Sequence, residues 1–360
     1  MKFQLPTYHA PNFEEERFVN APDCTLEAVV KDGVAPDNYH ALSVYPEYYK
    51  IQGEWYLAHQ SRMDCVPVFT GERIEIIEFR NLKVGDRVVL GRTEDASEGI
   101  YLHSSGFQSD DEENDVFAFR TGRSRETAYS KDYDHLYQLL EHEKEHGYVV
   151  WVLGPAVSFD HDARHAVSSL IEKGYVDALL AGNALATHDL EGSLLKTALG
   201  QDIYTQVSYP NGHYNHLDLI NLVRRSGSIA QFLKDYEIRT GIIAACEANN
   251  VPYVLGGSIR DDGPLPPVFG NVYEAQDAMR AHTRKATTVI CLATQLHTIA
   301  TGNMTPAYTQ VDGVIRPVYI YSVDISEFVV NKLRDRGTLE VTTMVTNVQD
   351  FVVNLDRNLE

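Results

Sequence analysis

Residues 148–191 constrain the fold more than any other stretch, because they read as strand, loop, helix, strand and loop. Residues 148–153 form an apolar run rich in valine, which is typical of a strand buried on both faces of a parallel sheet. Residues 163–174 place apolar side chains at helical spacing and end in a glycine, and residues 176–181 are a second apolar strand. Two parallel strands that both end in small-residue loops predict a crevice at their carboxyl ends, where open α/β sheets bind ligands.

The rest of the chain predicts more of the same sheet. A helical block of roughly sixty residues follows, and four further strands are expected at 252–255, 288–293, 318–323 and 340–345, before a final helix. Strands separated by helical patterns indicate right-handed crossovers. The fold class is therefore α/β, with a mostly parallel, Rossmann-like sheet domain over residues 131–360.

A smaller β-rich domain is expected ahead of that sheet, over residues 1–130. Residues 1–30 carry scattered prolines and predict irregular structure, whereas residues 37–91 contain short alternating strands separated by turns. A helical period begins at Tyr133, with Asp132 as the expected N-cap. The acidic run at residues 109–115 is interpreted as a solvated loop.

The composition excludes several classes of protein. A formal net charge of −20 at pH 7 disfavours nucleic acid and membrane surfaces as partners, because both require a basic surface. No apolar run is long enough to span a membrane, and no signal peptide is recognisable, so we expect a cytoplasmic location. The four cysteines show no zinc-site spacing, so we expect reduced thiols and no metal. A small molecule is the expected partner.

The predicted strand ends carry the residues expected to bind a cofactor. Glycine lets a ligand approach the backbone, the helix that follows offers free amide groups, and an acidic residue at a strand end can bind ribose. No GxGxxG motif opens the sheet, so tight turns needed only for packing are the alternative. The candidates are Gly154, Pro155, Ala156, Gly182, Asn183, Ala184, Gly257, Ser258, Asp324 and Asn347.

Longer segments resemble one family, that of the archaeal and cyanobacterial ornithine cyclodeaminases, whose core is also called the LOR/SDH-like domain. The segments in the predicted sheet domain are LGPAV (153–157), GYVDALLAGNALATHDLE (174–191), RRSGSI (224–229), GGSIRDDGPLPPV (256–268), EAQDAMR (274–280) and GNMTP (302–306). GVAPDNYH (33–40) and MDCVPVF (63–69) extend the resemblance into the N-terminal part. It covers roughly residues 30–360.

This resemblance implies a sheet domain similar to the NAD-binding domain of deoxyhypusine synthase, a tightly held NAD and a homo-oligomer. It also implies conversion of L-ornithine to L-proline with loss of ammonia. That chemistry needs a dry site, a proton acceptor and a cation for the substrate carboxylate. No guanidine-hydrolysing module is recognisable ahead of residue 30, so arginine is not an expected substrate. The alternatives are a net dehydrogenase of the amino-acid or saccharopine type and a non-catalytic NAD-binding module.

Seven residues are expected to act on the substrate. The catalytic candidates are Asp64, Cys65, His188 and Asp262, and the substrate-binding candidates are Arg62, His213 and Arg260. His188 can move protons near neutral pH, and the charges at 260–262 follow a glycine turn, where packing alone explains them poorly. The family resemblance favours Asp64, with Arg62 as a carboxylate partner. The family tends to have a further histidine where Asn215 stands, which weakens the case for His213 in a proton relay.

Plainer interpretations stay open for several residues. Cys65 fits a small buried apolar side chain, and Asn183 fits a backbone cap as well as it fits a ligand contact. Asp189 and Glu191 are expected to cap or solvate their helix. His297 is interpreted as a hydrogen-bonded structural histidine, although the pattern places it at the same edge of the sheet.

Overall fold

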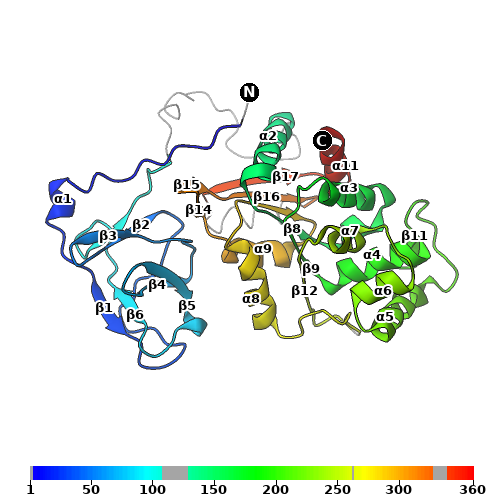
Figure 1. The fold of residues 1–360 in the computed structure, drawn as a ribbon, viewed down its shortest axis with the longest axis horizontal. Coiled ribbons are helices and arrows are strands. Elements are labelled where there is room, and N and C mark those ends of the chain that lie inside the picture. Colours follow the sequence, from blue (N-terminus) through cyan, green and yellow to red (C-terminus); the bar gives the residue numbers. More distant parts are fainter. Residues whose placement is uncertain (1–2, 108–128, 262, 327–338) are drawn as a thin grey trace.

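The computed structural model describes residues 3–107, 129–261, 263–326 and 339–360. Figure 1 shows a β-rich N-terminal module, in blue and cyan, beside a larger domain built on a central sheet. The predicted α/β class, with a smaller β-rich part first, is therefore confirmed. No helix in the described ranges combines the length and the apolar character that crossing a membrane requires.

The N-terminal module, residues 3–107, consists of two antiparallel sheets. One has the strand order β1-β6-β4-β5 and the other β3-β2-β7. Residues 1–30 were expected to be irregular, but they include a short helix and the first strand. The elements are α1 (Glu16–Val19), β1 (Thr25–Ala28), β2 (Glu47–Ile51), β3 (Glu54–Leu57), β4 (Cys65–Phe69), β5 (Ile74–Glu78), β6 (Arg87–Leu90) and β7 (Ile100–Leu102).

The larger domain is built on one six-stranded sheet, in which every neighbouring pair is parallel. Numbered along the chain, its strands lie in the order 3-2-1-4-5-6, which is the order of doubly wound dinucleotide-binding folds. The strands, in spatial order, are β12 (Tyr253–Gly256), β9 (Ala178–Gly182), β8 (Val149–Leu153), β13 (Thr288–Leu292), β16 (Tyr319–Asp324) and β17 (Glu340–Val345).

Helices cover both faces of this sheet. The larger elements are α2 (Ser130–His146), η3 (Pro155–Phe159), α3 (His161–Glu172), α4 (Asn183–Leu195), α5 (Asn215–Ser226), α6 (Ile229–Asp235), α7 (Ile242–Asn249), α8 (Val272–Thr283), α9 (Gln295–Met304) and α11 (Val348–Asn358). Small elements complete the domain: β10 (Thr197–Ala198), β11 (Gln201–Asp202), η4 (Gly212–Tyr214), β14 (Tyr308–Val311) and β15 (Val314–Pro317), with η1 (Phe79–Asn81) in the N-terminal module.

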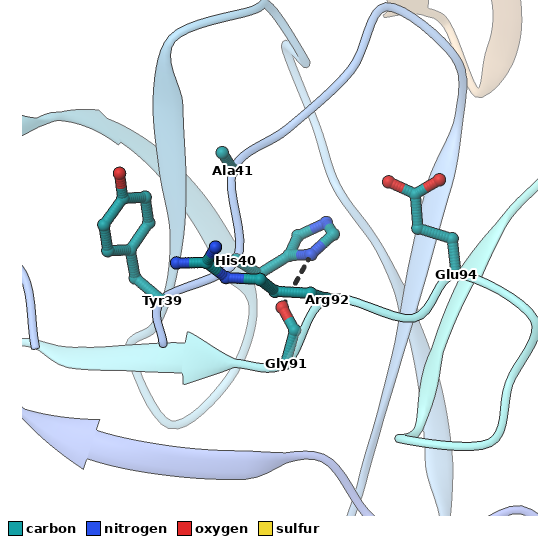
Figure 2. Close-up of a pocket in the computed structure, with 6 residues that line it drawn as sticks. All are labelled: Tyr39, His40, Ala41, Gly91, Arg92 and Glu94. Atoms are coloured by element: carbon teal, nitrogen blue, oxygen red, sulfur yellow. Dashed lines mark hydrogen bonds between the residues drawn. The ribbon is translucent and has the colours of Figure 1, made fainter. Parts of the chain in front are cut away.

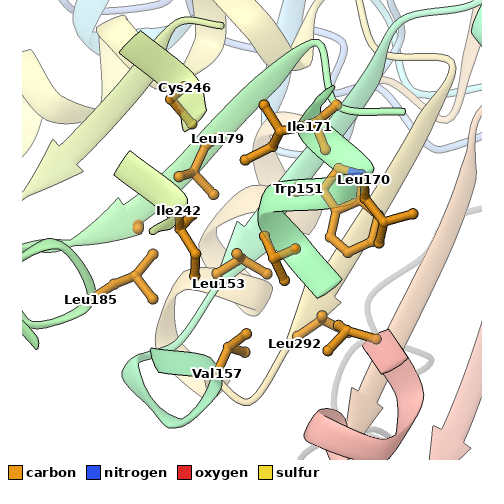
Figure 3. Close-up of a cluster of buried hydrophobic side chains, with 14 of the residues drawn as sticks. Trp151, Leu153, Val157, Leu170, Ile171, Leu179, Leu185, Ile242, Cys246 and Leu292 are labelled. Carbon is orange, nitrogen blue, oxygen red and sulfur yellow. The ribbon is translucent and has the colours of Figure 1, made fainter. Parts of the chain in front are cut away.

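The side chains of β8 alternate between two hydrophobic cores, as a strand requires. Trp151 and Leu153 face a cluster formed with α3, α4, α7 and α11, part of which is shown in Figure 3. Val150 and Val152 face a second cluster, which includes Met304 of α9 and residues of α8. The indole nitrogen of Trp151 donates a hydrogen bond of 2.9 Å to the Tyr175 carbonyl. The central strand is therefore anchored on both faces.

The topological switch point of the sheet lies between β8 and β13, because the strand order reverses direction there. The helix after β8, α3, packs in one core, and the helix after β13, α9, packs in the other. Two chains that leave a sheet towards opposite faces open a gap between them, which is where doubly wound folds bind nucleotides. The sequence placed this crevice between β8 and β9, and that placement is corrected by the strand order.

The N-terminal module contacts the opposite, amino edge of the sheet. The Ala307 amide donates to the Ser61 carbonyl at 3.0 Å, and the side chain of Gln60 reaches the Arg284 carbonyl at 3.4 Å. Ala307 follows α9, and Arg284 follows α8. Both helices begin at the carboxyl edge and run back across the sheet, so the residues after them lie at the amino edge. The module therefore meets the sheet domain away from the crevice.

Candidate active site

Glycines at the strand ends allow the loops of the carboxyl edge to lie close together. A Cβ atom on Gly154 would lie 2.0 Å from the carbonyl oxygen of Ala293, so only glycine lets the turn after β8 pass the turn after β13. A Cβ on Gly257 would lie 2.9 Å from the Phe269 carbonyl oxygen. Both glycines are thus explained by packing of the chain itself, and they shape the crevice whatever it binds.

Within the part of the chain that the structure describes, two helices that begin at this edge have no side-chain cap at their N-termini. Neither Gly182, which precedes α4, nor Thr294, which precedes α9, forms a side-chain cap. By contrast, α3 and α8 are capped by Asp160 and Asn271. Uncapped amide groups and the helix dipole suit an anion such as a diphosphate. The carboxyl edge therefore fits the diphosphate of a dinucleotide.

Asp324 and Asn347 are occupied by local hydrogen bonds. The Asp324 carboxylate accepts from the Ser326 amide at 2.9 Å, and the Asn347 side chain caps α11 through the amides of Gln349 and Asp350. The Gln349 side chain in turn donates to the carbonyl of Ala156, at 3.0 Å. These contacts hold the start of α11 against η3, which begins with Pro155.

His188 forms a buried pair with Glu191 in the second and third turns of α4. Its Nδ1 lies 3.0 Å from Oε2 of Glu191, and the side chain of Glu191 is fully buried. The His188 ring packs edge-on against Phe159 of η3, with ring centroids 5.4 Å apart. Because η3 directly follows β8, this contact puts His188 near the carboxyl end of that strand.

Glu191 is held in its ionised form by several donors. It accepts from the Thr197 hydroxyl at 2.7 Å and from the Gly200 amide at 3.0 Å, as well as pairing with His188. Burial opposes ionisation, but these hydrogen bonds outweigh it and hold the pKa of the carboxyl below its usual range. The expectation that Glu191 caps or solvates its helix is wrong, because its side chain orients His188. The side-chain amide of Asn215 joins this network by donating a hydrogen bond of 2.8 Å to the Thr197 hydroxyl.

Asp189 and Asn183 hold neighbouring segments in place. Asp189 is fully buried, pairs with Nε of Arg164 at 2.9 Å and accepts from the amides of Ile242 and Ile243 at the start of α7. Asp189 therefore caps α7. The sequence had suggested that it caps or solvates its own helix, and that expectation is wrong. The side-chain oxygen of Asn183 accepts from the Leu265 amide at 3.0 Å, which ties α4 to the loop after β12. Ala184 follows it in the first turn of α4.

Two further histidines lie near this edge. A Cβ on Gly182 would meet Cε1 of His297 at 3.1 Å, so that ring covers the end of β9. The structure gives the side chain of His297 no hydrogen bond within the described ranges, and burial lowers its pKa. The ring of His216 lies 6.1 Å from that of His188, and its Nδ1 is buried without a partner in the described part of the chain.

The loop after β12 projects outward. The Asp261 carboxylate accepts from the Ser258 amide at 2.7 Å and closes a turn, while the side chain of Arg260 is exposed at the same edge. Asp262 lies outside the described residues. His213 is exposed on η4, and its ring lies 4.3 Å from that of Tyr214, with the two planes tilted by 39°.

Asp64, Cys65 and Arg62 lie at the other edge of the sheet. Asp64 is exposed in a turn with φ of 62°, directly before β4. Cys65 is buried in the core of the module, and burial raises the pKa of its thiol to about 11. Arg62 is buried against Glu78 of β5. The structure thus does not bring these three residues together with His188 in one chain.

The N-terminal module has a cavity of its own, of about 220 Å³, shown in Figure 2. It is lined by Tyr39, His40, Ala41, Gly91, Arg92 and Glu94. Nε2 of His40 lies 2.8 Å from the buried carboxylate of Glu47, which ties the ring into the module core. Within the described ranges, no three His, Cys, Asp or Glu side chains gather so as to hold a metal ion.

The sheet domain matches a known family. The model of the ArgZ-like arginine dihydrolases, C-terminal domain with a Rossmann fold, matches residues 135–355. An ornithine cyclodeaminase of Methanocaldococcus jannaschii is 37% identical over 346 residues, which cover 93% of this chain and 77% of that protein. The bifunctional arginine dihydrolase/ornithine cyclodeaminase AgrE of Nostoc sp. is 36% identical over 94% of this chain, which spans only 47% of AgrE.

Solved structures support the same family assignment as the sequence matches. A LOR/SDH protein from Methanococcus maripaludis superposes with a TM-score of 0.85 at 34% identity, covering 94% of this chain and 98% of that one. AgrE in complex with ornithine and NAD+ gives a TM-score of 0.59 at 34% identity, covering 94% and 46%. The chain therefore belongs to the family that unites the archaeal ornithine cyclodeaminases with the ArgZ-like C-terminal Rossmann domains.

Proposed function

We propose that this protein is an NAD-dependent ornithine cyclodeaminase, which converts L-ornithine to L-proline and ammonia. The observation that carries the proposal is the buried His188–Glu191 pair, which lies beside η3 at the point where the strand order reverses. Such a pair would supply a proton acceptor beside the switch point at which this fold binds nucleotides, and this supports the proposal. The archaeal relatives named ornithine cyclodeaminase support the choice of substrate.

NAD fits the carboxyl edge. The amide groups at the starts of α4 and α9 would hold its diphosphate, and Gly154 and Gly257 would act indirectly, by letting the loops of this edge pass close to one another. Bound there, the cofactor supplies reversible acceptance of a hydride from the α-carbon of the amino acid. Because the same hydride is returned to the cyclic imine, the reaction is redox-neutral.

His188 is proposed to accept and return the protons of the reaction. The ionised Glu191 binds Nδ1, which fixes that nitrogen as the proton-bearing one and leaves Nε2 as the base. His188 is 8% exposed, so little water surrounds it, and a dry site protects the imine from hydrolysis. The neutral ring of His297 is a second candidate acceptor across the end of β9.

We propose Arg260 as the partner of the substrate carboxylate in place of Arg62. Arg260 lies at the carboxyl edge, is exposed and forms no ion pair with any residue that the structure describes. Arg62 is buried at the amino edge and already pairs with Glu78. A guanidinium group suits this role because it binds a carboxylate through two parallel hydrogen bonds.

The test is product analysis with the purified full chain. Incubated with ornithine and NAD, it should release ammonia and proline in equal amounts without accumulating NADH. NADH formed in step with the product would instead establish the net dehydrogenase. Tightly bound NAD with no turnover of ornithine, lysine or other basic amino acids would establish a non-catalytic NAD-binding module.

A homo-oligomer is also proposed. Apolar side chains are exposed on the segment after α4, and they include Tyr204 at 75% and Val207 at 63% exposure. A second copy is the partner that would cover them. Light scattering on the purified protein tests this. All four cysteines are free and buried, which agrees with the cytoplasmic location proposed for the enzyme.

A further inference from the structure

Arginine side chains gather where the N-terminal module meets the end of α8. Oε1 of Glu78 lies 2.9 Å from Nε of Arg280 and 3.5 Å from Nη2 of Arg284, and the same oxygen accepts a hydrogen bond from Nη2 of Arg62. A carboxylate oxygen has two lone pairs, so it cannot satisfy three guanidinium groups. The other oxygen of Glu78 accepts from Asn81 at 2.9 Å.

Donors therefore exceed acceptors in this cluster. Within the described part of the chain, Nε of Arg62, of Arg280 and of Arg284 are all buried without a hydrogen-bond acceptor. Nε of Arg280 is close to Glu78, but its N–H is not directed at the oxygen. The neighbouring Asp277 does not correct the imbalance, because it pairs with Arg80 at 2.6 Å and lies 3.5 Å from Arg280.

Most of this charge is buried. Arg62 is 2% exposed, Arg280 8% and Glu78 7%. A buried charge without a full complement of acceptors is unfavourable, and an oxyanion with two or more oxygens would supply the acceptors that are missing. The cluster is open on one side, because the side chain of Arg284 is 40% exposed and that of Arg80 is 30% exposed.

We propose that Arg62, Arg280 and Arg284 form a binding site for a small oxyanion, a carboxylate or a phosphate group, at the junction of the N-terminal module and α8. Its ligand contacts both parts of the molecule, since Arg62 precedes β4 and the other two arginines belong to the end of α8. The site lies at the amino edge of the sheet, so it is distinct from the proposed active site and does not depend on it.

Thermal unfolding of the full chain tests the site without ornithine or NAD. Inorganic phosphate and acetate are titrated separately at constant ionic strength, with chloride as the balancing anion. A ligand that binds only the folded state raises the midpoint in a saturable way. We expect such a rise with at least one of the two anions, and the one that gives it identifies phosphate or carboxylate as the group recognised. No saturable rise with either would overturn the proposal.

Variants locate the effect. Arg284→Gln keeps the pairing of Arg62 and Arg280 with Glu78, so it should fold and bind the anion at least tenfold more weakly. Glu78→Gln removes a competing carboxylate and should bind it more tightly. Arg225→Gln, at an exposed position of α5, is the matched control and should titrate as wild type does. Equal anion dependence in Arg284→Gln and wild type would rule out the cluster as the site.

Discussion

Nδ1 of His188 lies 3.0 Å from Oε2 of Glu191, within one helix, and both side chains are buried. Glu191 is itself bound by Thr197 and Gly200, which come from the segment after the helix. The ring of His188 is therefore held by a carboxylate that is itself fixed by two further hydrogen bonds. Such second-layer support keeps a catalytic base in one orientation.

Replacing His188 should abolish most of the turnover. We expect His188→Gln to lower kcat by about 10² to 10⁴, since positioned general bases contribute that much, and to leave NAD affinity within about threefold of wild type. The rate of ammonia release measures kcat, and fluorescence titration measures NAD affinity. His165→Gln, at an exposed position of α3, should match wild type in both. Retained turnover in His188→Gln would remove this residue from the mechanism.

Adding a methyl group at Gly154 should force the crevice apart. The Cβ of Gly154→Ala would lie 2.0 Å from the Ala293 carbonyl, which is backbone and cannot swing away. We expect stability to fall by about 1–3 kcal/mol and NAD binding to weaken at least tenfold. Gly270→Ala is the control, because nothing lies within 4 Å of its Cβ position. Calorimetric titration with NAD compares the affinities of the two variants. Equal affinities would show that NAD does not bind beside Gly154.

Asp189 should contribute strongly to stability. Asp189→Ala leaves Arg164 buried without its partner and removes the cap of α7, so the free energy of unfolding should fall by about 3–5 kcal/mol. Urea unfolding followed by tryptophan fluorescence measures this. Asp162→Ala removes a carboxylate of α3 whose side chain is 69% exposed, and it should cost less than about 1 kcal/mol. A similar loss of unfolding free energy in both variants would show that the buried Asp189–Arg164 pair contributes no more than an exposed carboxylate does.

Glu78 should make stability depend on pH in the acid range. Burial opposes its ionisation, but Arg62 and Arg280 outweigh burial and lower the pKa from 4.5 to about 2. A lowered folded-state pKa means that the stabilisation is complete above pH 4.5 and is lost as the pH falls towards 2. The free-energy difference between wild type and Glu78→Gln should therefore shrink by up to about 3 kcal/mol over that range. A constant difference in unfolding titrations would contradict this.

Asp64→Asn tests whether the N-terminal module takes part in catalysis. The sequence resemblance predicts a substrate-side role for Asp64, but the structure places it at the amino edge, in an exposed turn. From that position we expect kcat and NAD affinity within about twofold of wild type. Loss of turnover with NAD still bound would mean that Asp64 completes the crevice of a second copy of the chain.

The sheet strands could be predicted from the sequence because each is a short apolar run. The expected strand at 148–153 is observed as Val149–Leu153, and 340–345 as Glu340–Val345. The strand expected at 176–181 begins two residues later, since the Asp177 side chain accepts the Val149 amide at 2.7 Å before the strands pair. Likewise α2 begins at Ser130 with Tyr129 at its N-cap position, and Asp132 lies inside it.

The partners of polar residues could not be predicted, because they come from distant parts of the chain. The pattern around Asp189 is that of a helix surface, and nothing nearby in sequence indicates that Arg164 and the start of α7 enclose it. Arg62 and Arg280 lie far apart in the chain and meet only because the N-terminal module docks against α8. Local periodicity carries no information about such contacts. The sequence therefore proposed His188 as a candidate, but it could not predict the residues that surround its side chain.

The pairing of β8 with β13 has a consequence for biosynthesis. The contact between Tyr148 and Thr287, at the start of these two strands, joins residues 139 positions apart. During translation, β8 emerges early and waits with one side unpaired until β13 has left the ribosome. Pairings of such long sequence separation form slowly, and an apolar strand edge is prone to aggregate in the meantime. We expect the yield of native enzyme to depend on elongation rate and on chaperones that shield Val149–Leu153.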